Sequence, residues 1–400
     1  MAKRSRLLPL LPAILGMVVL LIQTALPGCP TKPAVAEEPE HPAESPEDGA
    51  NLEIRPGAEI ESLLAAAPDG GTVRLARARY RLSRSLEIRR PVHLLGEDGT
   101  VLEMQPGAST SLFDVRDVDA REDGGPVVIE RMMLSGNREA QRGGSGILLL
   151  SCAGCIVRDV TIRSFWQDGL YASDARECLF ERIILEDCGR NGLSFGERIV
   201  EPASEGNRIL GAAARDNASI GFDVEPGIGN RFEDCVATGN GSYGFSVGAG
   251  ARSHGNALVR CRAERNGDHG INLWSGENEV LSCESRRNAG DGISIVLAAG
   301  NTISDCAASE NGRHGIGLDR ASGSLLRANL AESNGRTGLG DGIALVAGTP
   351  VYDNLLTGNL VRGDSHRYAL VVTAKVLRTV LEGNSFEGPL SVAARDVTWR

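Results

Sequence analysis

From Gly146 to Gly342 the sequence repeats itself roughly every 23 residues. Each repeat aligns on a glycine followed by an apolar residue, and successive glycines lie 22 to 29 residues apart. These glycines are Gly146, Gly169, Gly192, Gly221, Gly244, Gly270, Gly292, Gly315 and Gly342. Repeats of this length bury their apolar face only by stacking on their neighbours. The period therefore predicts a solenoid rather than a globule with one central core.

Each repeat is expected to contain short strands separated by tight turns. Ile271-Asn272-Leu273 and Ile293-Ser294-Ile295 alternate apolar and polar side chains, as in a strand with one buried face. Asn-Gly pairs lie between such segments and accept the left-handed backbone of a tight turn. No helix-period segment intervenes, so βαβ layering is excluded. Each strand should pair with its equivalent one coil away, about 4.8 Å along the axis.

Two further sets of residues recur once per repeat and are expected to form columns. Asparagines stacked at a turn hydrogen-bond as a ladder, and small cysteine side chains pack inward as a column of free thiols. Disulfides between neighbouring coils are the alternative. The residues concerned are Asn230, Asn256, Asn278 and Asn301, each five residues before Cys235, Cys261, Cys283 and Cys306, together with Asn217, Asn240, Asn266, Asn288, Asn311 and Asn334.

The segment before the repeats resembles a known superfamily. Glu59 to Ala67 forms a short amphipathic pattern, and Gly70-Gly71-Thr72-Val73 and Val92-His93-Leu94-Leu95-Gly96 follow it. This resembles the opening of the pectate-lyase-like right-handed β-helix superfamily. The resemblance implies an all-β fold: one right-handed parallel β-helix over residues 51–400, about 23 residues per coil, with a short N-terminal helix capping it.

The resemblance does not define an activity, because the superfamily contains lyases, hydrolases, epimerases and non-catalytic members. Pectin-type hydrolases of this fold carry Asp-Asp and Arg-Ile-Lys motifs, alginate epimerases carry Asp-Pro-His-Asp/Glu, and pectate lyases carry Trp-Ile-Asp-His. None of these motifs occurs in the sequence. No catalytic residue is therefore carried over from the superfamily.

The N-terminus has the features of an export signal. Lys3, Arg4 and Arg6 precede an apolar run from residue 7 to residue 26. Leu26-Pro27-Gly28-Cys29 resembles the lipobox of bacterial lipoproteins, which implies a signal peptide over residues 1–28 and lipidation of Cys29. A plain signal peptide or an uncleaved anchor is the alternative. Residues 29–50, rich in Pro and Glu, are expected to be a disordered tether. We therefore expect a cell-envelope lipoprotein anchored to a membrane and facing the periplasm or exterior.

The charge restricts the partners. The chain carries a formal net charge of −10, and removal of residues 1–28 with their three cations gives −13. Nucleic acid and anionic lipid are poor partners for such a chain. We expect a monomer that meets a polysaccharide or another cell-envelope glycan. The aromatic content of 4% is low for a glycan-binding protein, and Trp166, Tyr171 and Trp274 are the expected exposed platforms.

One strand breaks the repeat pattern. In Gly221-Phe222-Asp223-Val224-Glu225-Pro226, the apolar pair should point inward, so that Asp223 and Glu225 both point outward on one strand. Equivalent outward positions hold Ser194, Ser246, Asn272 and Ser294. Two carboxylates at this spacing suit a Ca²⁺ site or an acid/base pair.

Longer loops are expected beside this strand. Six extra residues occur between Glu197 and Glu205, and the next two coils place further polar or aromatic residues after the same strand. Long loops on a rigid solenoid commonly build binding sites. The candidate site therefore comprises Arg198, Asp223, Glu225, Arg252, His254, Asn272, Trp274 and Glu277. Since insertions at turns are also tolerated cheaply, solvated loops without a function are the alternative.

A second row of polar residues precedes the repeat glycines: Asp168, Asn191, His269, Asp291, His314 and Asp341. Alternating imidazoles and carboxylates suit a metal or proton relay. Residues of these types also close turns, and the sequence favours that structural role.

Two functions remain open. In the first, the chain is a non-catalytic β-helix that binds a polysaccharide or a surface partner through loops on one edge. In the second, it is a polysaccharide lyase or epimerase acting on a uronate-containing glycan. There Ca²⁺ would lie at Asp223 and Glu225, and Arg252 or His254 would abstract a sugar proton. Regular coils and missing motifs favour the first.

Overall fold

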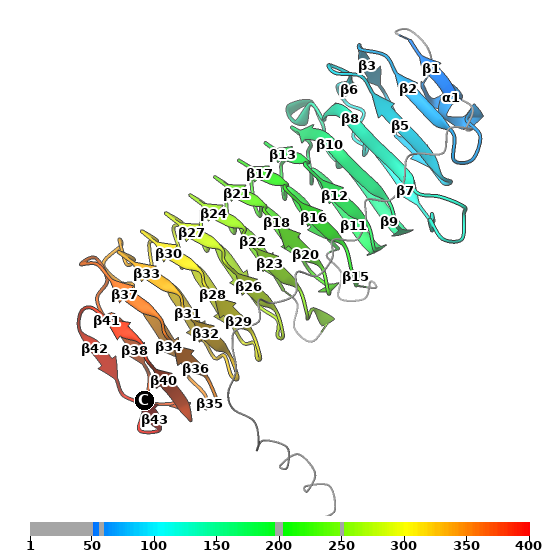
Figure 1. Ribbon diagram of the computed structural model, residues 1–400. Coiled ribbons are helices and arrows are strands. Elements are labelled where there is room, and N and C mark those ends of the chain that lie inside the picture. Colours follow the sequence, from blue (N-terminus) through cyan, green and yellow to red (C-terminus); the bar gives the residue numbers. More distant parts are fainter. Residues whose placement is uncertain (1–50, 56–59, 197–202, 249–251) are drawn as a thin grey trace, which may run out of the picture. The chain divides into compact units, whose positions relative to one another are not determined.

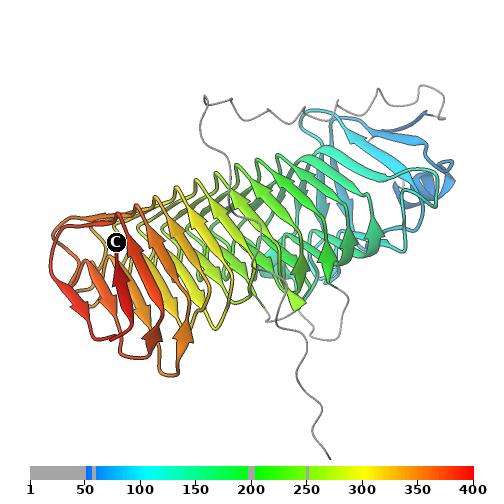
Figure 2. The ribbon, with the colours of Figure 1, turned by 60° about the horizontal axis from the view of Figure 1, so that its bottom comes forward.

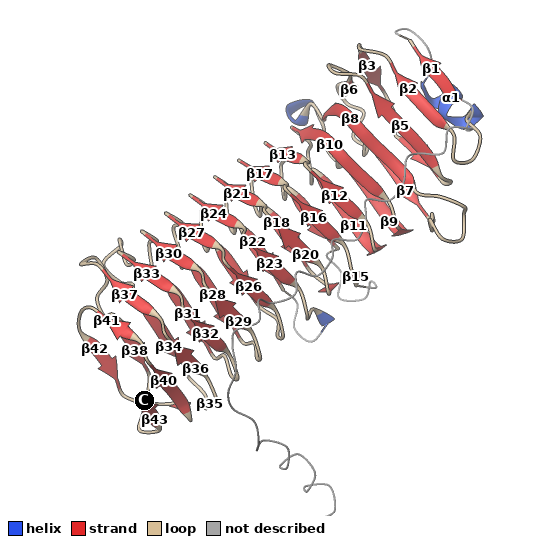
Figure 3. Cartoon of the chain, viewed as in Figure 1, coloured by secondary structure: helices blue, strands red, loops and turns tan. Residues whose placement is uncertain are grey.

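The computed structural model describes residues 51–55, 60–196, 203–248 and 252–400. The predicted signal peptide, Cys29, the tether and Arg198 lie outside these residues. The described residues form a parallel β-solenoid in which every paired strand runs parallel to its neighbour (Figures 1 and 2). Figure 3 shows how few helices accompany the strands. Among the described residues, no helix is long and apolar enough to cross a membrane.

Each coil contributes strands to three stacks. Stack 1 comprises β1 (Asn51–Ile54), β2 (Thr72–Leu75), β5 (Val92–Gly96), β8 (Val127–Ser135), β10 (Ile156–Arg163), β12 (Leu179–Glu181), β16 (Arg208–Leu210), β20 (Arg231–Glu233), β23 (Ala257–Val259), β26 (Glu279–Leu281), β29 (Thr302–Ser304), β32 (Leu325–Arg327), β36 (Leu355–Thr357), β40 (Thr379–Glu382) and β43 (Val397–Trp399).

Stack 2 comprises β3 (Arg79–Leu82), β6 (Val101–Met104), the far halves of β8 and β10, β13 (Ile184–Glu186), β17 (Ala213–Arg215), β21 (Val236–Thr238), β24 (Arg262–Glu264), β27 (Glu284–Arg286), β30 (Ala307–Ser309), β33 (Leu330–Glu332), β37 (Leu360–Arg362) and β41 (Ser385–Phe386).

Stack 3 comprises β4 (Leu86–Ile88), β7 (Phe113–Arg116), β9 (Ile147–Ala153), β11 (Leu170–Arg176), β14 (Leu193–Phe195), β18 (Phe222–Val224), β22 (Phe245–Val247), β25 (Ile271–Leu273), β28 (Ile293–Val296), β31 (Ile316–Asp319), β34 (Ile343–Val346), β38 (Leu370–Val372) and β42 (Leu390–Val392). Short extra pairs join β15 (Ser204–Glu205) to β19 (Gly227–Ile228) and β35 (Val351–Tyr352) to β39 (Val376–Leu377). Helix α1 (Ile60–Ala66) lies where the sequence predicts the capping helix, and η1 (Arg138–Ala140) follows β8.

The core is a continuous column of apolar side chains that the three stacks enclose. Alternate residues of each strand point inward, and aromatic side chains from neighbouring coils stack there. The rings of Phe222 and Phe245 are 5.0 Å apart and nearly parallel, and Phe232 contacts both edge-on. The inward orientation predicted for Phe222 and Val224 is thus confirmed.

Three corners join the strands of a coil, and ladders of side chains run along them. Corner 1 precedes stack 1, corner 2 separates stacks 1 and 2, and corner 3 separates stacks 2 and 3. Asn207, Asn230, Asn256, Asn278 and Asn301 stack at corner 1, and Asn217, Asn240, Asn266, Asn288, Asn311 and Asn334 stack at corner 3. All of them are buried, as the sequence predicts for a ladder.

The asparagines form the predicted ladders. Each Nδ2 donates to the Oδ1 of the asparagine one coil further on, over 2.8 to 3.2 Å. The same Oδ1 accepts the backbone N–H of the preceding asparagine. These ladder asparagines therefore have their partners only because the neighbouring coils are in register.

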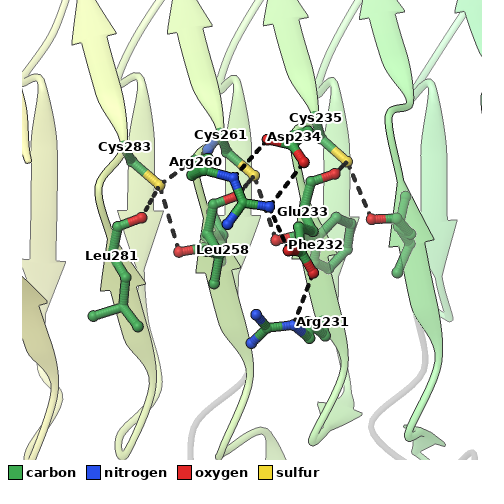
Figure 4. A network of polar contacts seen from close by, with 12 residues as sticks. Arg231, Phe232, Glu233, Asp234, Cys235, Leu258, Arg260, Cys261, Leu281 and Cys283 are labelled. Carbon is green, nitrogen blue, oxygen red and sulfur yellow. Dashed lines mark hydrogen bonds and ion pairs between the residues drawn. The ribbon is translucent and has the colours of Figure 1, made fainter. Parts of the chain in front are cut away.

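At corner 2, cysteines take the positions that asparagines hold further along the same column. The N–H of Cys283 donates to Cys306 Sγ at 3.3 Å, and the N–H of Cys306 donates to Asn329 Oδ1 at 2.9 Å. Cys306 Sγ donates to the carbonyl of Val280, as Asn329 Nδ2 donates to that of Ile303. Figure 4 shows part of this column, with Arg260 outside it bonded to Glu233 and Asp234.

All eight cysteines of the described residues are buried and free, which confirms the prediction of a thiol column. Burial raises the pKa of the Cys188 thiol to about 12. Burial, together with the neighbouring Cys235 and Cys283, raises that of Cys261 as well. A thiol that stays protonated is a poor nucleophile, so Cys188 and Cys261 are packing elements.

A buried ion cluster joins the first coils. Glu130 on β8 lies with its Oε1 2.8 Å from Nε2 of His93, and Arg158 of β10 bonds its other oxygen. Burial alone would raise the pKa of Glu130, but the hydrogen bonds from His93 and Arg158 outweigh it and lower the pKa from 4.5 to about 2. The sequence gives no sign of this cluster, because its coils precede the regular repeat.

We predict that Asn266→Ala lowers the free energy of unfolding by about 3 kcal/mol. The substitution leaves donors on Asn240 and the carbonyl of Ala237 buried without partners. Urea unfolding followed by circular dichroism would measure it. Arg262→Ala, which removes an exposed side chain of the same coil, is the control and should change little. Equal losses in both variants would contradict the ladder's role.

We predict that Glu130→Gln weakens the dependence of stability on acid pH. Because folding lowers the pKa of Glu130, its carboxylate stabilises the fold fully above pH 4.5, and this contribution is lost as the pH falls through about 2. Unfolding free energies at several pH values between 2 and 6 would test this. The exposed Glu279, replaced by Gln, serves as control. A slope unchanged from the parent chain would refute the prediction.

Candidate functional site

The outward side chains of stack 3 form a buried row. Register pairing places Ser194, Asp223, Ser246, Asn272 and Ser294 beside one another in consecutive coils. All are buried although they point away from the core. Strands about 4.8 Å apart bring these short side chains close enough to shield one another from solvent.

Asp223 departs from its prediction. Only 6% of it is exposed, and its Oδ2 accepts hydrogen bonds from Asn191 Nδ2 at 3.2 Å and Ser194 Oγ at 3.5 Å. Glu225 lies beyond the end of β18 and is half-buried. Asp223 therefore points outward as predicted but is buried by its neighbours, whereas Glu225 follows the strand instead of lying on it.

Glu225 and Trp274 come together across a glycine. Gly248 N donates to the Val224 carbonyl and Trp274 N to the Val247 carbonyl, so residues 225, 248 and 274 occupy equivalent positions in consecutive coils. A Cβ on Gly248 would lie 3.5 Å from Glu225 Oε2 and 3.8 Å from Trp274 Cβ. Glu225 and Trp274 thus flank Gly248 at equivalent positions of the two neighbouring coils, and Trp274 is 43% exposed. We call Glu225, Gly248 and Trp274 the Trp274 platform.

Asn272 lies in the same coil as Trp274, deeper in the row. It is fully buried, and within the described residues neither its Oδ1 nor its Nδ2 has a hydrogen-bond partner. An unsatisfied buried amide group costs about 1–3 kcal/mol. The fold thus keeps the Asn272 amide in the coil of the platform although this lowers the stability of the fold. Such unsatisfied polar groups are common at binding sites.

Glu277 is a second residue of this coil whose conformation lowers the stability of the fold. Its φ is 59°, a left-handed value, while the residues before the corner-1 asparagines in the neighbouring coils are Gly229, Gly255 and Gly300. A residue with a Cβ loses about 1 kcal/mol in this conformation relative to glycine. Its exposed side chain begins at the corner beyond Trp274.

The remaining candidates are spread along the same edge. His254 is exposed, and its backbone pairs with Ile228 and Gly276, so it lies near corner 1 and not on the strand of Asp223. Arg252 is half-buried two residues before it. Residues 197–202 and 249–251 lie outside the described residues, but the flanking strands β14 and β22 both end in stack 3 directly before them. The grouping of these loops into one site stays a prediction.

The row before the repeat glycines is structural, as the sequence favours. Asp291 N donates to His269 Nδ1 at 2.8 Å, His314 N to Asp291 Oδ1 at 3.0 Å, and Asp341 N to His314 Nδ1 at 3.1 Å. Each side chain thus caps the backbone of the next coil. No group of three or more His, Cys, Asp or Glu side chains in the described ranges could hold a metal ion. A Ca²⁺ at Asp223 and Glu225 would need further oxygen ligands.

Sequence reasoning found Trp274 and Trp166 as exposed aromatic residues, whereas Tyr171 is half-buried. It missed Gly248, whose absent side chain creates the platform. The signal was present, since Gly248 follows the strand at the position that Glu225 and Trp274 hold in their coils. The equivalence of Gly248 with Glu225 and Trp274 can be recognised only when the register between coils of unequal length is known.

Solved structures share this architecture. The mannuronan C-5 epimerase AlgE4 A-module of Azotobacter vinelandii superposes with a TM-score of 0.61 at 20% identity, covering 85% of this chain and 93% of that one. The catalytic domain of a GH87 α-1,3-glucanase in complex with tetrasaccharides gives a TM-score of 0.67 at 13% identity, over 86% and 70%. Tailspike protein 3 of bacteriophage CBA120 gives 0.62 at 11% identity, over 85% and 56%. At these identities the likeness concerns the fold alone.

No curated protein sequence matches the chain. The family model described as "Right handed beta helix region" matches residues 120–258 and 246–386, more than half of the sequence. This agrees with the coil length, the parallel register and the ladders, and it confirms the handedness that the resemblance implied. The chain therefore belongs to the right-handed β-helix family.

Proposed function

We propose that the protein binds a polysaccharide of low charge on the Trp274 platform without transforming it. The observation that carries the proposal is an exposed indole at the same strand-end position as a carboxylate two coils away, with a glycine in the coil between them. An indole face packs against the apolar face of a sugar ring, and a carboxylate accepts hydrogen bonds from its hydroxyl groups. Both groups sit on rigid strand ends, as binding sites on solenoids commonly do.

The surroundings support a glycan of low charge. The formal net charge of −10 opposes an anionic polymer, and Glu225 adds local negative charge. The structural neighbours include a mannuronan epimerase and a glucanase bound to tetrasaccharides, and a polysaccharide partner for this chain accords with them.

A carboxylate pair favours a second candidate function, that of a polysaccharide lyase, epimerase or hydrolase. Asp223 is buried two residues before the half-buried Glu225, and two carboxylates in different environments are the usual acid/base arrangement. The absence of the known motifs of the superfamily from the sequence speaks against it.

We further propose that the mature chain is anchored in the cell envelope through a lipid on Cys29. The basic start, the apolar run and the lipobox-like Leu26-Pro27-Gly28-Cys29 support this.

We predict that Trp274→Ala weakens binding to a neutral polysaccharide at least tenfold, because exposed aromatic anchors dominate such contacts. Gly248→Val should weaken it as well by filling the gap. Affinity electrophoresis and calorimetry on a panel of neutral and uronate polysaccharides would measure both. Trp399→Ala is the matched control, since Trp399 is 51% exposed in the last coil. Equal affinities in the Trp274 and Trp399 variants would contradict the proposal.

The same panel tests the catalytic alternative through unsaturated-product absorbance, reducing ends and the epimer content of the polymer. Product that forms with the parent chain and disappears in Asp223→Asn or Glu225→Gln would replace the binding function by an enzymatic one. Full turnover in both variants would place any activity elsewhere.

We predict that Cys29→Ser moves the protein from the detergent phase to the aqueous phase on Triton X-114 partitioning. Without the thiol no lipid is attached, and the form from which residues 1–28 have been cleaved then has no hydrophobic anchor. Metabolic labelling with a radioactive fatty acid, incorporated by the parent chain and not by the variant, provides the direct measurement. Identical partitioning of both forms would rule out the anchor.

A further inference from the structure

We propose that the protein has a second binding groove, centred on Trp166 at corner 3, that takes a neutral oligosaccharide. It uses residues separate from the Trp274 platform and lies at the opposite end of the stack-3 strands: Trp166 precedes β11, whereas Trp274 follows β25. The proposal therefore does not depend on the function of the platform.

The groove is a hollow of about 400 Å³ open to solvent. Its lining consists of Arg138, Trp166, Gln167, Gly189, Arg190 and Ala218. A second hollow of about 290 Å³ adjoins it and shares Arg138. These volumes lie in the range of small-ligand sites. Helix η1, drawn as a short blue helix beside β8 and β10 in Figure 3, carries Arg138 and forms the wall between the two hollows.

Two close backbone contacts build the groove. A Cβ on Gly189 would lie 2.1 Å from the carbonyl oxygen of Trp166, so this turn requires glycine, as do the equivalent turns at Gly241, Gly267 and Gly312. A Cβ on Gly136 would lie 2.6 Å from Cα of Phe165, so glycine also lets the segment that leads to η1 pass tightly over the same turn. The loop is thus seated against the coil of Trp166.

The polar groups of the groove are held in place before any ligand binds. Arg190 donates from Nε and Nη2 to the two oxygens of Asp168, at 2.9 and 2.6 Å, and Asp168 is only 1% exposed. Arg138 Nη1 donates to the carbonyl and to Oδ1 of Asp187, both at 3.1 Å. Planar guanidinium groups fixed by carboxylates present their remaining edges in defined directions.

Arg138 and Arg190 of the groove are each paired with an aspartate, so their charges are compensated. The adjoining hollow is lined by Arg138 and Arg163 and by the acids Glu103, Glu139 and Asp187, and it carries no excess of positive charge. A surface with an exposed indole, 41% accessible at Trp166, and paired planar polar groups suits sugar hydroxyls and a sugar face rather than a charged ligand. We therefore assign a neutral oligosaccharide of a few rings.

The three tryptophans of the chain allow each site to be read separately. In the full chain carrying Trp274→Phe and Trp399→Phe, Trp166 is the sole indole. Its emission would be titrated with maltohexaose, cellohexaose and laminarihexaose, and with a mannuronate hexamer as the acidic probe. We expect a saturable shift with at least one neutral probe, a response to the acidic probe at least fivefold weaker, and a fivefold or greater loss of affinity in Arg138→Ala or Arg190→Ala.

Arg182→Ala is the matched control. Arg182 binds both oxygens of Asp159 at 2.7 and 2.9 Å, as Arg190 binds Asp168, but it lies outside the groove. It should leave the affinity unchanged. If the arginine variants fail to fold, loss of calorimetric binding in Trp166→Phe within the otherwise intact chain replaces them.

Absence of a saturable response up to about 1 mM probe, or a preference for the acidic hexamer, would overturn the proposal. A loss in Arg182→Ala as large as in Arg190→Ala would also overturn it. The reciprocal variant, Trp166→Phe with Trp399→Phe, reports on Trp274 alone, so failure of one site is separated from failure of the other.

Discussion

The structure depends on a single interaction repeated along its axis: a buried amide side chain that finds its partners only on the next coil. An asparagine such as Asn266 accepts two hydrogen bonds from Asn240 and donates to Asn288 and to the Ala237 carbonyl. Each of these groups would be costly to bury alone. Slipping a coil by one residue would break the ladders at both asparagine corners and turn the strand faces inside out. The ladders therefore fix the register that the apolar core alone would leave less defined.

A fixed register also explains at which corners the length of the connecting segments varies between coils. From β12 onward, the strands of stacks 1 and 2 are separated by only two residues at corner 2, whereas the segment after each stack-3 strand changes in length from coil to coil. The Trp274 platform lies at that variable edge, and it joins residues from coils of unequal length through the absent side chain of Gly248. The Trp166 groove arises likewise from a departure, the η1 segment that interrupts the early coils. The regular coils form the scaffold, and both candidate sites lie where loops or η1 interrupt the regular repeat.

The fold and its ladders could be predicted from the sequence, whereas the contacts of the candidate sites could not, and both outcomes have physical reasons. The columns containing Asn230, Asn240 and Cys235 follow from spacing, because equal intervals must stack, and the inward orientation of Phe222 follows from alternation. The burial of Asp223 does not follow, since it depends on how closely Asn191 and Ser194 approach. The alignment of Glu225, Gly248 and Trp274 in three coils depends on loop lengths, and the setting of Trp166 depends on a helix outside the repeat. Local patterns predict elements, whereas sites arise from distances between elements.

The mixed column at corner 2 has a consequence for how such a chain evolves. The thiol of Cys306 and the amide of Asn329 each accept a hydrogen bond from the backbone N–H of the equivalent residue one coil before. Each also donates to a backbone carbonyl at the equivalent position of an earlier coil. Coils are therefore interchangeable building blocks, and duplicating or deleting one leaves both cut ends able to rejoin. The stretch from Phe222 to Asn278 is the exception, because an added coil within it would separate Glu225 from Trp274. The number of coils can therefore change during evolution along most of the solenoid. The segment from Phe222 to Asn278 keeps the Trp274 platform only if its number of coils stays the same.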